Sequence, residues 1–134
     1  MKLQVGVKAL IKNSSNQFLF IRRAVTFGEE KQPHWDIPGG RINADEPLLD
    51  ALRREIMEET GLQCESTPTL LAAQDIFASR IDLHVVRLTY LIEGTGDPNL
   101  SDEHQEAKWM TIEEVLTENP DPYIREVLES QKNL

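Results

Sequence analysis

The 134-residue sequence predicts one α/β domain, built from a mixed β-sheet with helices on its faces. Two observations support this prediction. Segments with strand and helix patterns interleave along the chain, and several strands follow one another with no helix between them. That order favours a mixed sheet over a purely parallel one. The length suits a single domain over residues 1–134, and the sequence contains no repeat, interdomain linker or low-complexity tract.

The N-terminal part of the chain is predicted to form two strands and a loop. Apolar and polar residues alternate over residues 4–12, which is typical of a strand with one covered face. The apolar run 18–21 has the continuous pattern of a central strand that is buried on both faces. Residues 26–34 are mostly polar and indicate a loop. A short extended piece follows at residues 35–37, and Pro38-Gly39-Gly40 is expected to interrupt it.

The rest of the chain is predicted to contain one long helix, three strands and two short helices. Residues 47–60 have a helical pattern, and residues 69–77 and 83–92 have strand patterns. The acidic, turn-rich stretch 93–106 predicts an exposed loop, and residues 107–110 form a last short strand. A capping box and an apolar stripe then indicate two C-terminal helices; these signals come from Thr111 with Glu114, and from Ile124, Val127 and Leu128.

The composition excludes several classes of protein. With 23 acidic and 14 basic side chains the formal charge is −9, so general nucleic-acid binding is not expected. No segment has the roughly 20 apolar residues that a membrane-spanning helix needs. The one cysteine, Cys64, allows no intrachain disulfide, and the first residues do not resemble a secretory signal. We therefore expect a cytoplasmic protein that binds neither nucleic acid nor membrane.

The predicted helix at 47–60 contains a conflict between charge and burial. Its ends are marked, because Pro47 suits the first turn and Gly61 suits the left-handed position after the last. When Leu52 is placed at the centre of the buried face, Glu59 projects only about 20° from it, inside the apolar stripe. Glu55 lies at the border of that stripe, and Glu58 lies beyond the border on the same side. Three carboxylates therefore converge on one edge of the surface that the helix is expected to bury.

Such a cluster is unfavourable for folding alone. Like charges three and four residues apart repel one another, and the C-terminal end of a helix disfavours anions. A solvated acidic face is one alternative, with a prior of about one in three because charge runs are usually hydrated. It does not explain Glu59 among leucines. Ion pairs with Arg53 and Arg54 are a second alternative, but two arginines cannot neutralise three glutamates that also stay exposed. Mg²⁺ or Mn²⁺ suits such oxygen ligands better.

The segment around this helix resembles the Nudix box. The match consists of Gly40, Glu46 and the run Arg54-Glu55-Ile56-x-Glu58-Glu59-x-Gly61-Leu62, and it fills every defining position across 23 residues. Two further pieces extend the resemblance. Trp35-x-x-Pro38-Gly39-Gly40 resembles the lead-in that is common in the family, and Phe20-x-Arg22-Arg23-Ala24 is similar to the strand end of its MutT-type members. The resemblance covers most of residues 3–116 and is dense only in the box.

The resemblance implies a Nudix-type α/β/α sandwich with a mixed β-sheet and the hydrolysis of a nucleoside diphosphate linked to another group. By position, Glu55, Glu58 and Glu59 would bind Mg²⁺ or Mn²⁺ together with the backbone carbonyl of Gly40. Arg54 would orient these glutamates through charge-assisted hydrogen bonds. Glu46 would brace the turn before the helix.

Four further residues are candidates by the same resemblance, each with a structural alternative. Glu103 would accept the proton of the attacking water, or it is a solvated loop acid. Arg23 would contact phosphate, or it is an ordinary surface arginine. Trp35 or Phe77 would stack on a base, although core packing is the more frequent role of each.

The substrate follows only by exclusion. Features associated with ADP-ribose, NADH and dinucleoside polyphosphates are absent after the box, which leaves a MutT-like nucleoside triphosphate pyrophosphohydrolase that releases a nucleoside monophosphate and pyrophosphate. Nucleotide-sugar, ADP-ribose, dinucleoside polyphosphate and RNA-cap substrates are the enzymatic alternatives. A non-catalytic nucleotide-sensing Nudix domain is another, which the intact box disfavours. The partner would be a small nucleoside di- or triphosphate, and the chain would be a monomer or homodimer.

Overall fold

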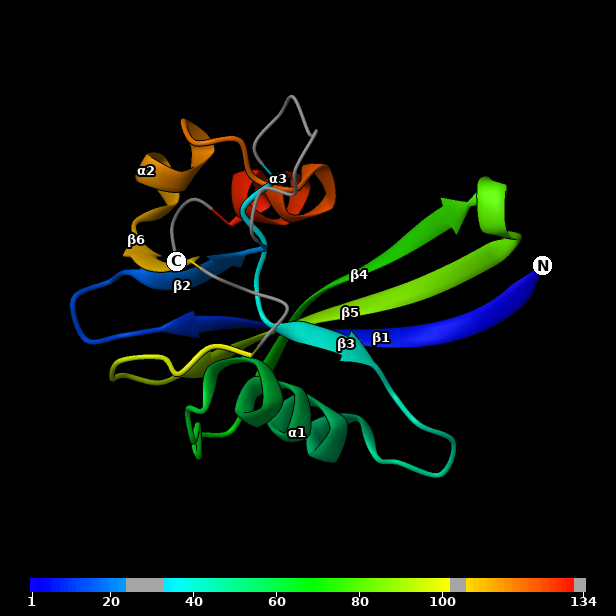
Figure 1. Ribbon diagram of the computed structural model, residues 1–134, viewed down its shortest axis with the longest axis horizontal. Helices are drawn as coiled ribbons and strands as arrows, with labels where there is room; N and C mark the ends of the chain where they lie inside the picture. The colour runs from blue at the N-terminus through cyan, green and yellow to red at the C-terminus, as the bar shows by residue number, and fades with distance from the viewer. Residues whose placement is uncertain (24–32, 102–105, 132–134) are drawn as a thin grey trace.

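A mixed β-sheet lies between helices on both of its faces in the computed structural model, which describes residues 1–23, 33–101 and 106–131 (Figure 1). Six strands form the sheet: β1 Lys2–Lys12, β2 Phe18–Arg22, β3 Gly39–Arg41, β4 Thr69–Ala78, β5 Leu83–Glu93 and β6 Glu106–Met110. The helices are α1 Leu48–Thr60, α2 Ile112–Leu116 and α3 Pro122–Ser130, with a 3₁₀ turn η1 at Ser79–Ile81. The predicted α/β/α sandwich is confirmed.

The sheet is mixed because one strand pair is parallel and the others are antiparallel. The order is β4-β5-β1-β2-β6, and β1 and β5 run parallel along their whole length. Strand β3 is antiparallel to the middle of β1, whereas β2 pairs with β1 only at Lys12 and Phe18. The strand β1 therefore holds together the two halves of the sheet.

Alternation of side chains along the strands gives the sheet two apolar faces. On one face Val7, Ala9 and Ile11 of β1 pack with Leu52 and Ile56 of α1. On the other face a second cluster lies beneath α2 and α3; it includes Leu10, Phe18, Phe20, Ile124 and Leu128. Figure 1 shows α1 on one side of the sheet and the two C-terminal helices on the other. The run predicted to be buried on both faces, residues 18–21, is confirmed.

Most of the predicted elements are confirmed, including their end signals. Helix α1 ends at Gly61, which has the left-handed φ of 71°, and Pro47 immediately precedes its first residue. Thr111 and Glu114 form the predicted capping box. All three apolar residues of the predicted stripe in α3 are buried. No helix in the described ranges is both long and apolar enough to cross a bilayer.

The prediction that Pro38-Gly39-Gly40 only interrupts an extended piece is wrong. Gly39 and Gly40 begin β3 and pair with Lys8 and Val7 of β1. A Cβ atom at Gly39 would collide with the carbonyl oxygen of Val7, so glycine permits this close pairing. The two glycines therefore mark a strand that is pressed against its neighbour.

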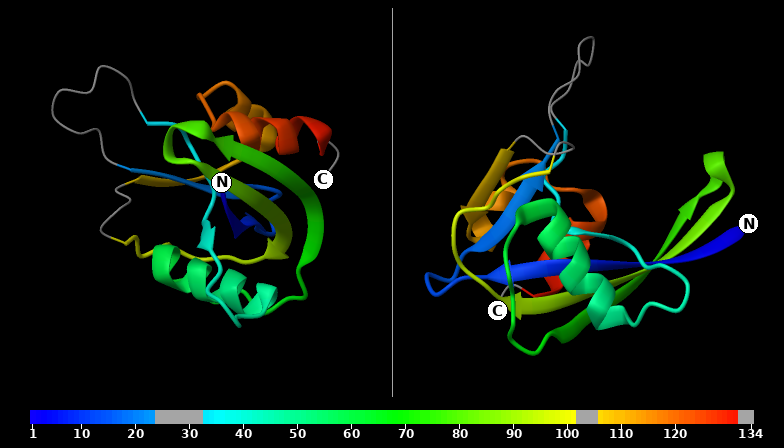
Figure 2. Two further views of the ribbon diagram at one scale, coloured as in Figure 1. Left: turned by 90° about the vertical axis from the view of Figure 1, so that its right-hand side faces the viewer. Right: turned by 60° about the horizontal axis from the view of Figure 1, so that its bottom comes forward.

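The sheet also extends beyond its helices at one end. Figures 1 and 2 show the N-terminal end of β1 projecting from the body side by side with the connected ends of β4 and β5. We call this three-stranded projection, residues 1–5 and 75–86, the arm. Phe77 lies in it and is 59 % exposed, so the core packing considered for Phe77 is wrong.

Candidate active site

The glutamate-rich end of α1 lies directly against β3. The backbone N–H of Gly39 donates a hydrogen bond of 3.2 Å to Oε2 of Glu59. A Cβ atom at Gly40 would lie 2.6 Å from the carboxyl group of Glu55, so only glycine lets this carboxylate approach the β3 backbone. The pairing of β3 with β1 fixes the position of Gly39 and Gly40, and the packing of α1 on the sheet brings its glutamates to them.

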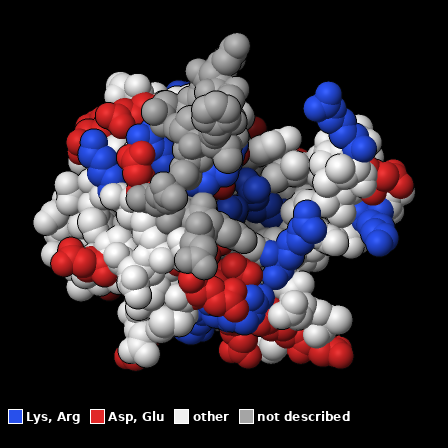
Figure 3. Space-filling view, in the orientation of Figure 1, with Lys and Arg blue, Asp and Glu red and all other residues white. Residues whose placement is uncertain are grey.

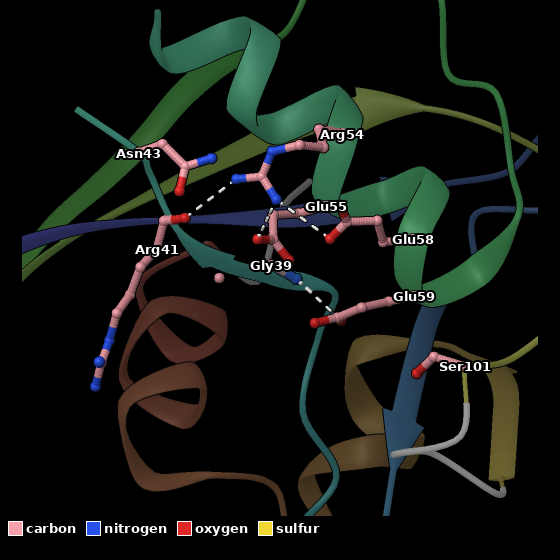
Figure 4. A pocket seen from close by; sticks show the side chains of 9 residues that line it. Gly39, Arg41, Asn43, Arg54, Glu55, Glu58, Glu59 and Ser101 are labelled. Atoms are coloured by element: carbon pink, nitrogen blue, oxygen red, sulfur yellow. Dashed lines mark hydrogen bonds and ion pairs between the residues drawn. The ribbon is translucent and has the colours of Figure 1, made fainter. Parts of the chain in front are cut away.

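An open cavity of about 940 Å³ lies at this junction, and Figure 4 shows the side chains around it. Its lining residues come from β3, the loop after it, α1 and the segment before β6: Gly39, Gly40, Arg41, Asn43, Arg54, Glu55, Glu58, Glu59 and Ser101. The three glutamates singled out by the helical projection are thus brought to one cavity.

Arg54 connects three carboxylates at the edge of this cavity. Its Nε and Nη2 donate to the two oxygens of Glu46 at 2.7 and 3.0 Å. Its Nη1 donates to Glu55 at 2.9 Å and to Glu58 at 3.2 Å. Nη2 also donates to the carbonyl oxygen of Arg41 at 3.2 Å. One guanidinium therefore fixes the positions of two cavity glutamates relative to β3.

Glu46 links the loop to the helix. It accepts hydrogen bonds from Arg54 and, at 2.9 Å, from the backbone N–H of Asn43. The Arg54 hydrogen bond and then the Asn43 N–H lower the pKa of Glu46 to about 2. Glu46 in turn raises the pKa of the Arg54 guanidinium through the same hydrogen bonds. These contacts are those expected of a residue that braces the turn before α1.

Glu59 is the carboxylate in the least favourable environment. Burial raises its pKa from the ordinary 4.5 to about 7, and the nearby Glu55 and Asp36 add to this rise. The ammonium of Lys8 and the N–H of Gly39 act in the opposite direction. Lys8 is itself held by Asp36 at 3.2 Å and by the carbonyl oxygen of Ile37 at 3.1 Å. The conflict predicted for Glu59 is therefore real in the folded chain.

The donor set of the cavity fits a divalent cation such as Mg²⁺ or Mn²⁺. Carboxylate oxygens are the ligands that these hard ions prefer, and Glu55, Glu58 and Glu59 all line the cavity. Within the described residues, no three acidic, histidine or cysteine side chains are already close enough together to hold a metal. The guanidinium of Arg54 lies between Glu55 and Glu58.

Basic side chains surround a smaller cavity beside the acidic one. This second cavity, of about 180 Å³, shares Gly40 and Arg41 with the first and is also lined by Lys8 and Arg87. Arg87 comes from β5 and lies 3.8 Å from Asp121 at the start of α3. In Figure 3 the acidic and basic side chains form adjacent patches on one face. The arrangement thus offers oxygen ligands for a cation next to cations for an anion.

Arg23 does not line the acidic cavity. It lines a separate hollow of about 260 Å³, with Arg22, His34, Asp36 and Asp121 among its neighbours. The proposed contact of Arg23 with phosphate stays a prediction.

The two aromatic candidates are corrected by the structure. Trp35 is 3 % exposed and belongs to the core beneath α3, and the guanidinium of Arg22 covers its ring at 4.3 Å. Burial therefore leaves no open ring face for a base. Phe77 is exposed but lies in the arm, stacked on His84, and does not line the acidic cavity. Glu103 lies outside the described residues.

Several residues of the site were missed by sequence reasoning. Arg41 and Asn43 directly follow Gly40, so their nearness in the chain was a usable signal. Ser101 lines the cavity because its backbone N–H donates to the carbonyl oxygen of Glu59 at 3.2 Å. The charge of Lys8, on the strand that pairs with β3, acts on Glu59. For Ser101 and Lys8 no local pattern in the sequence signals the interaction.

Comparisons with known proteins agree with this geometry. A family model described as NUDIX domain matches residues 2–131. The crystal structure of the MutT protein from Methanosarcina mazei Go1 superposes with a TM-score of 0.80 and is 30 % identical, covering 96 % of this chain and 91 % of that one.

Two curated relatives are similar over part of the chain. The 8-oxo-dGDP phosphatase NUDT18 of Danio rerio is 32 % identical over 108 residues, which are 77 % of this chain and 30 % of that protein. An RNA pyrophosphohydrolase of Pseudomonas fluorescens is 35 % identical over 82 residues, 61 % of this chain and 48 % of that protein. The chain spans less than half the length of either relative.

Proposed function

This chain belongs to the Nudix family, and from that premise we propose that it hydrolyses compounds in which a nucleoside diphosphate is linked to a further group. The observation that carries the proposal is the convergence of Glu55, Glu58 and Glu59 on one open cavity beside β3. Folding alone does not favour this convergence, whereas binding of a dication and a diphosphate does. We further propose a MutT-like nucleoside triphosphate as the substrate, with a nucleoside monophosphate and pyrophosphate as products.

The metal would be held by these three glutamates, with the backbone of Gly40 beside them. A bound Mg²⁺ or Mn²⁺ neutralises charge on phosphate oxygens and lowers the pKa of the attacking water. Arg54 positions Glu55 and Glu58 for that task through the hydrogen bonds described above. Because a dication favours the ionised form of a nearby carboxyl, its binding would release the proton that Glu59 holds near neutral pH.

The cations beside the acidic cavity support a phosphate-containing substrate. Arg41, Lys8 and Arg87 line the second cavity and are suited to the part of the polyphosphate that the metal does not reach. This explains how a chain of charge −9 can bind a polyanion. We retain Glu103 as the proposed acceptor of the proton from water.

The choice of substrate is supported by what the relatives are named for. One relative acts on an oxidised guanine nucleotide and another on RNA, and both names describe cleavage of phosphate groups. The superposed structure from Methanosarcina mazei Go1 is that of a MutT protein. The name RNA pyrophosphohydrolase agrees with release of pyrophosphate from a triphosphate, whereas the name 8-oxo-dGDP phosphatase describes a diphosphate substrate, so both classes belong in a substrate panel.

A substrate panel tests the proposal. Nucleoside triphosphates, oxidised guanine nucleotides, ADP-ribose, nucleotide sugars, dinucleoside polyphosphates and 5′-triphosphate RNA are each incubated with Mg²⁺ or Mn²⁺. Nucleotide products are separated by chromatography for every member of the panel, and released phosphate is measured with and without added inorganic pyrophosphatase, which separates pyrophosphate from phosphate as the product of the triphosphates. Pyrophosphate released from triphosphates, and only with metal, is the expected result. Conversion of ADP-ribose, a nucleotide sugar or a dinucleoside polyphosphate to its nucleotide product, with no conversion of triphosphates, would instead select that alternative substrate.

Matched variants connect the activity to the site. Glu58→Gln is expected to lower turnover at least about a hundredfold while the fold persists, because it removes a charged oxygen ligand. Glu65→Gln is the control, since Glu65 is an exposed glutamate outside the cavity. Full activity of Glu58→Gln would contradict the proposed metal site. Absence of any hydrolysis across the panel would favour the non-catalytic alternative.

A further inference from the structure

The arm exposes apolar side chains that no described residue covers. Of the seven large hydrophobic side chains that are exposed in the described chain, four lie in the arm: Met1 at 62 %, Leu3 at 64 %, Phe77 at 59 % and Ile81 at 67 %. Such a concentration on one small projection marks a contact surface rather than the scattered apolar residues that are normal on any protein.

The strand register places part of this apolar surface on one face. Leu3 pairs with His84, and His84 pairs with Phe77, so these three residues form a row across β1, β5 and β4. Their side chains point to the same face because paired residues share a face of the sheet. Val5 and Val86 form part of the next row on that face. Helix α1 covers this face only from Val7 onward, so the arm extends beyond its cover.

The face of the arm that carries Leu3 and Val5 borders a groove. A cavity of about 490 Å³ separates Leu3 and Val5 of β1 from the loop before α1, and Ile42 and Ala44 add apolar walls on the loop side. Its acidic side chains are Asp45 and Glu46. Because Glu46 is already bound by Arg54, Asp45 is the acid that an incoming group would meet.

The tip of the arm, residues 1–3 and 77–83, carries cations opposite in charge to Asp45 of the groove, which is also lined by Arg41. Lys2 and Arg80 lie at the tip, and neither makes an ion pair with another described residue. Asp45 likewise has no ion-pair partner within the described ranges. Figure 3 shows basic side chains on the projecting part, with an acidic group among them, and further acidic side chains along the lower edge of the molecule. A tip with exposed apolar side chains and cations therefore complements a groove of mixed lining, in which the apolar walls lie beside Asp45.

We propose that the arm forms a symmetric homodimer in which the tip of each copy lies in the groove of the other. In a two-fold dimer each copy must offer both the tip and the groove, because each contact occurs twice. This chain has both features. Phe77 and Ile81 would pack on the apolar walls of the groove, and Arg80 would lie beside the partner's Asp45. The groove shares Arg41 and Asn43 with the acidic cavity, so the seated tip would border the active site.

The oligomeric state of the purified chain tests the proposal. Sedimentation equilibrium from about 1 to 100 µM is expected to show a dimer of twice the 15.3 kDa chain mass. Phe77→Gln is expected to raise the dimer dissociation constant at least about tenfold, because it removes the largest apolar group of the tip. Leu70→Gln is the matched control, since Leu70 is also an exposed apolar residue of β4, 54 % exposed, but lies outside the arm. Circular dichroism verifies that both variants are folded.

A charge exchange distinguishes tip-in-groove pairing from any other dimer. Arg80→Glu alone and Asp45→Lys alone are each expected to be monomeric, because each places like charges opposite one another at both contacts. Mixing the two variants is expected to restore a dimer, since both contacts then join opposite charges. Asp45→Asn controls for the left-handed backbone at this position, where φ is 65°. A monomeric parent chain, or a dimer that survives Phe77→Gln and both charge reversals, would overturn the proposal.

Discussion

Replacement of Glu59 by glutamine is expected to stabilise the metal-free protein at alkaline pH and to abolish its activity. Glutamine has nearly the same shape as glutamate, and its side-chain oxygen can still accept the hydrogen bond from Gly39. The variant removes the charge that burial disfavours. The pKa of Glu59 is about 7 in the folded chain against an ordinary 4.5, so the folded protein binds more protons than the unfolded chain between these values. The stability of the parent protein therefore falls as the pH rises through this window.

The size of the effect follows from the pKa shift. One pKa unit corresponds to about 1.4 kcal/mol, so the shift corresponds to roughly 3 kcal/mol of lost stability above neutral pH. Partial exposure of the side chain reduces this to about 2 kcal/mol, most of which is lost between about pH 5 and pH 8. Glu59→Gln does not lose this stability, because its side-chain amide does not ionise. Its advantage in the free energy of unfolding over the parent is thus expected to grow by about 2 kcal/mol across that range.

Urea unfolding in the presence of a chelator measures this difference directly. The parent, Glu59→Gln and the control Glu65→Gln are unfolded at about pH 5 and about pH 8, and their free energies of unfolding are compared at each pH. Glu65→Gln is expected to follow the parent, because Glu65 is exposed. Added Mg²⁺ is expected to stabilise the parent more than Glu59→Gln. An advantage that is the same at both pH values would refute the burial argument for Glu59.

Three further predictions concern the residues around Glu59 and one helix end. Arg54→Lys is expected to lower kcat at least about tenfold, since lysine cannot bind Glu46 through two nitrogens and also reach Glu55; steady-state kinetics with Mg²⁺ tests this, and an unchanged kcat would contradict the positioning role. Gly40→Ala is expected to weaken Mn²⁺ binding about tenfold or more in calorimetric titration, because its Cβ would displace the Glu55 carboxyl, whereas undisturbed affinity would show that this close approach is dispensable. Thr111→Ala is expected to cost about 1 kcal/mol in urea unfolding with activity retained, because it removes the capping box of α2; a cost near zero would mean that packing alone holds this helix.

Local patterns in the sequence predicted most of the fold. Strand alternation, the Gly61 helix end and the Thr111 capping box are each determined by residues close together in the chain, and all three are confirmed. The exception is β3, which exists because Gly39 and Gly40 can approach β1. That pairing depends on residues about thirty positions earlier. No window of local sequence contains this information.

The same distinction explains which parts of the site were predicted. The three glutamates lie on one helix, so their convergence could be projected from helical geometry alone. The charge of Lys8 acts on Glu59 because of strand register, and Ser101 contacts Glu59 because of loop packing, so neither interaction has a local signature. Trp35 and Phe77 show the reverse error, because an aromatic side chain fits a core, a base-stacking position or an exposed contact surface equally well by composition. Only the surroundings of each ring, which long-range packing determines, distinguish these roles.

The environment of Glu59 depends both on the local sequence of α1 and on long-range packing. Its place in an apolar stripe is a local fact, and it predicts an energetic cost in the absence of compensation. The compensation in the folded chain is incomplete, because Gly39 and Lys8 do not offset burial and the pKa stays raised. A fold selected only for stability would have replaced this carboxyl with an apolar or amide side chain. The unrelieved cost at Glu59, beside glutamates that Arg54 already holds in place, is therefore the physical reason to expect a cationic ligand there.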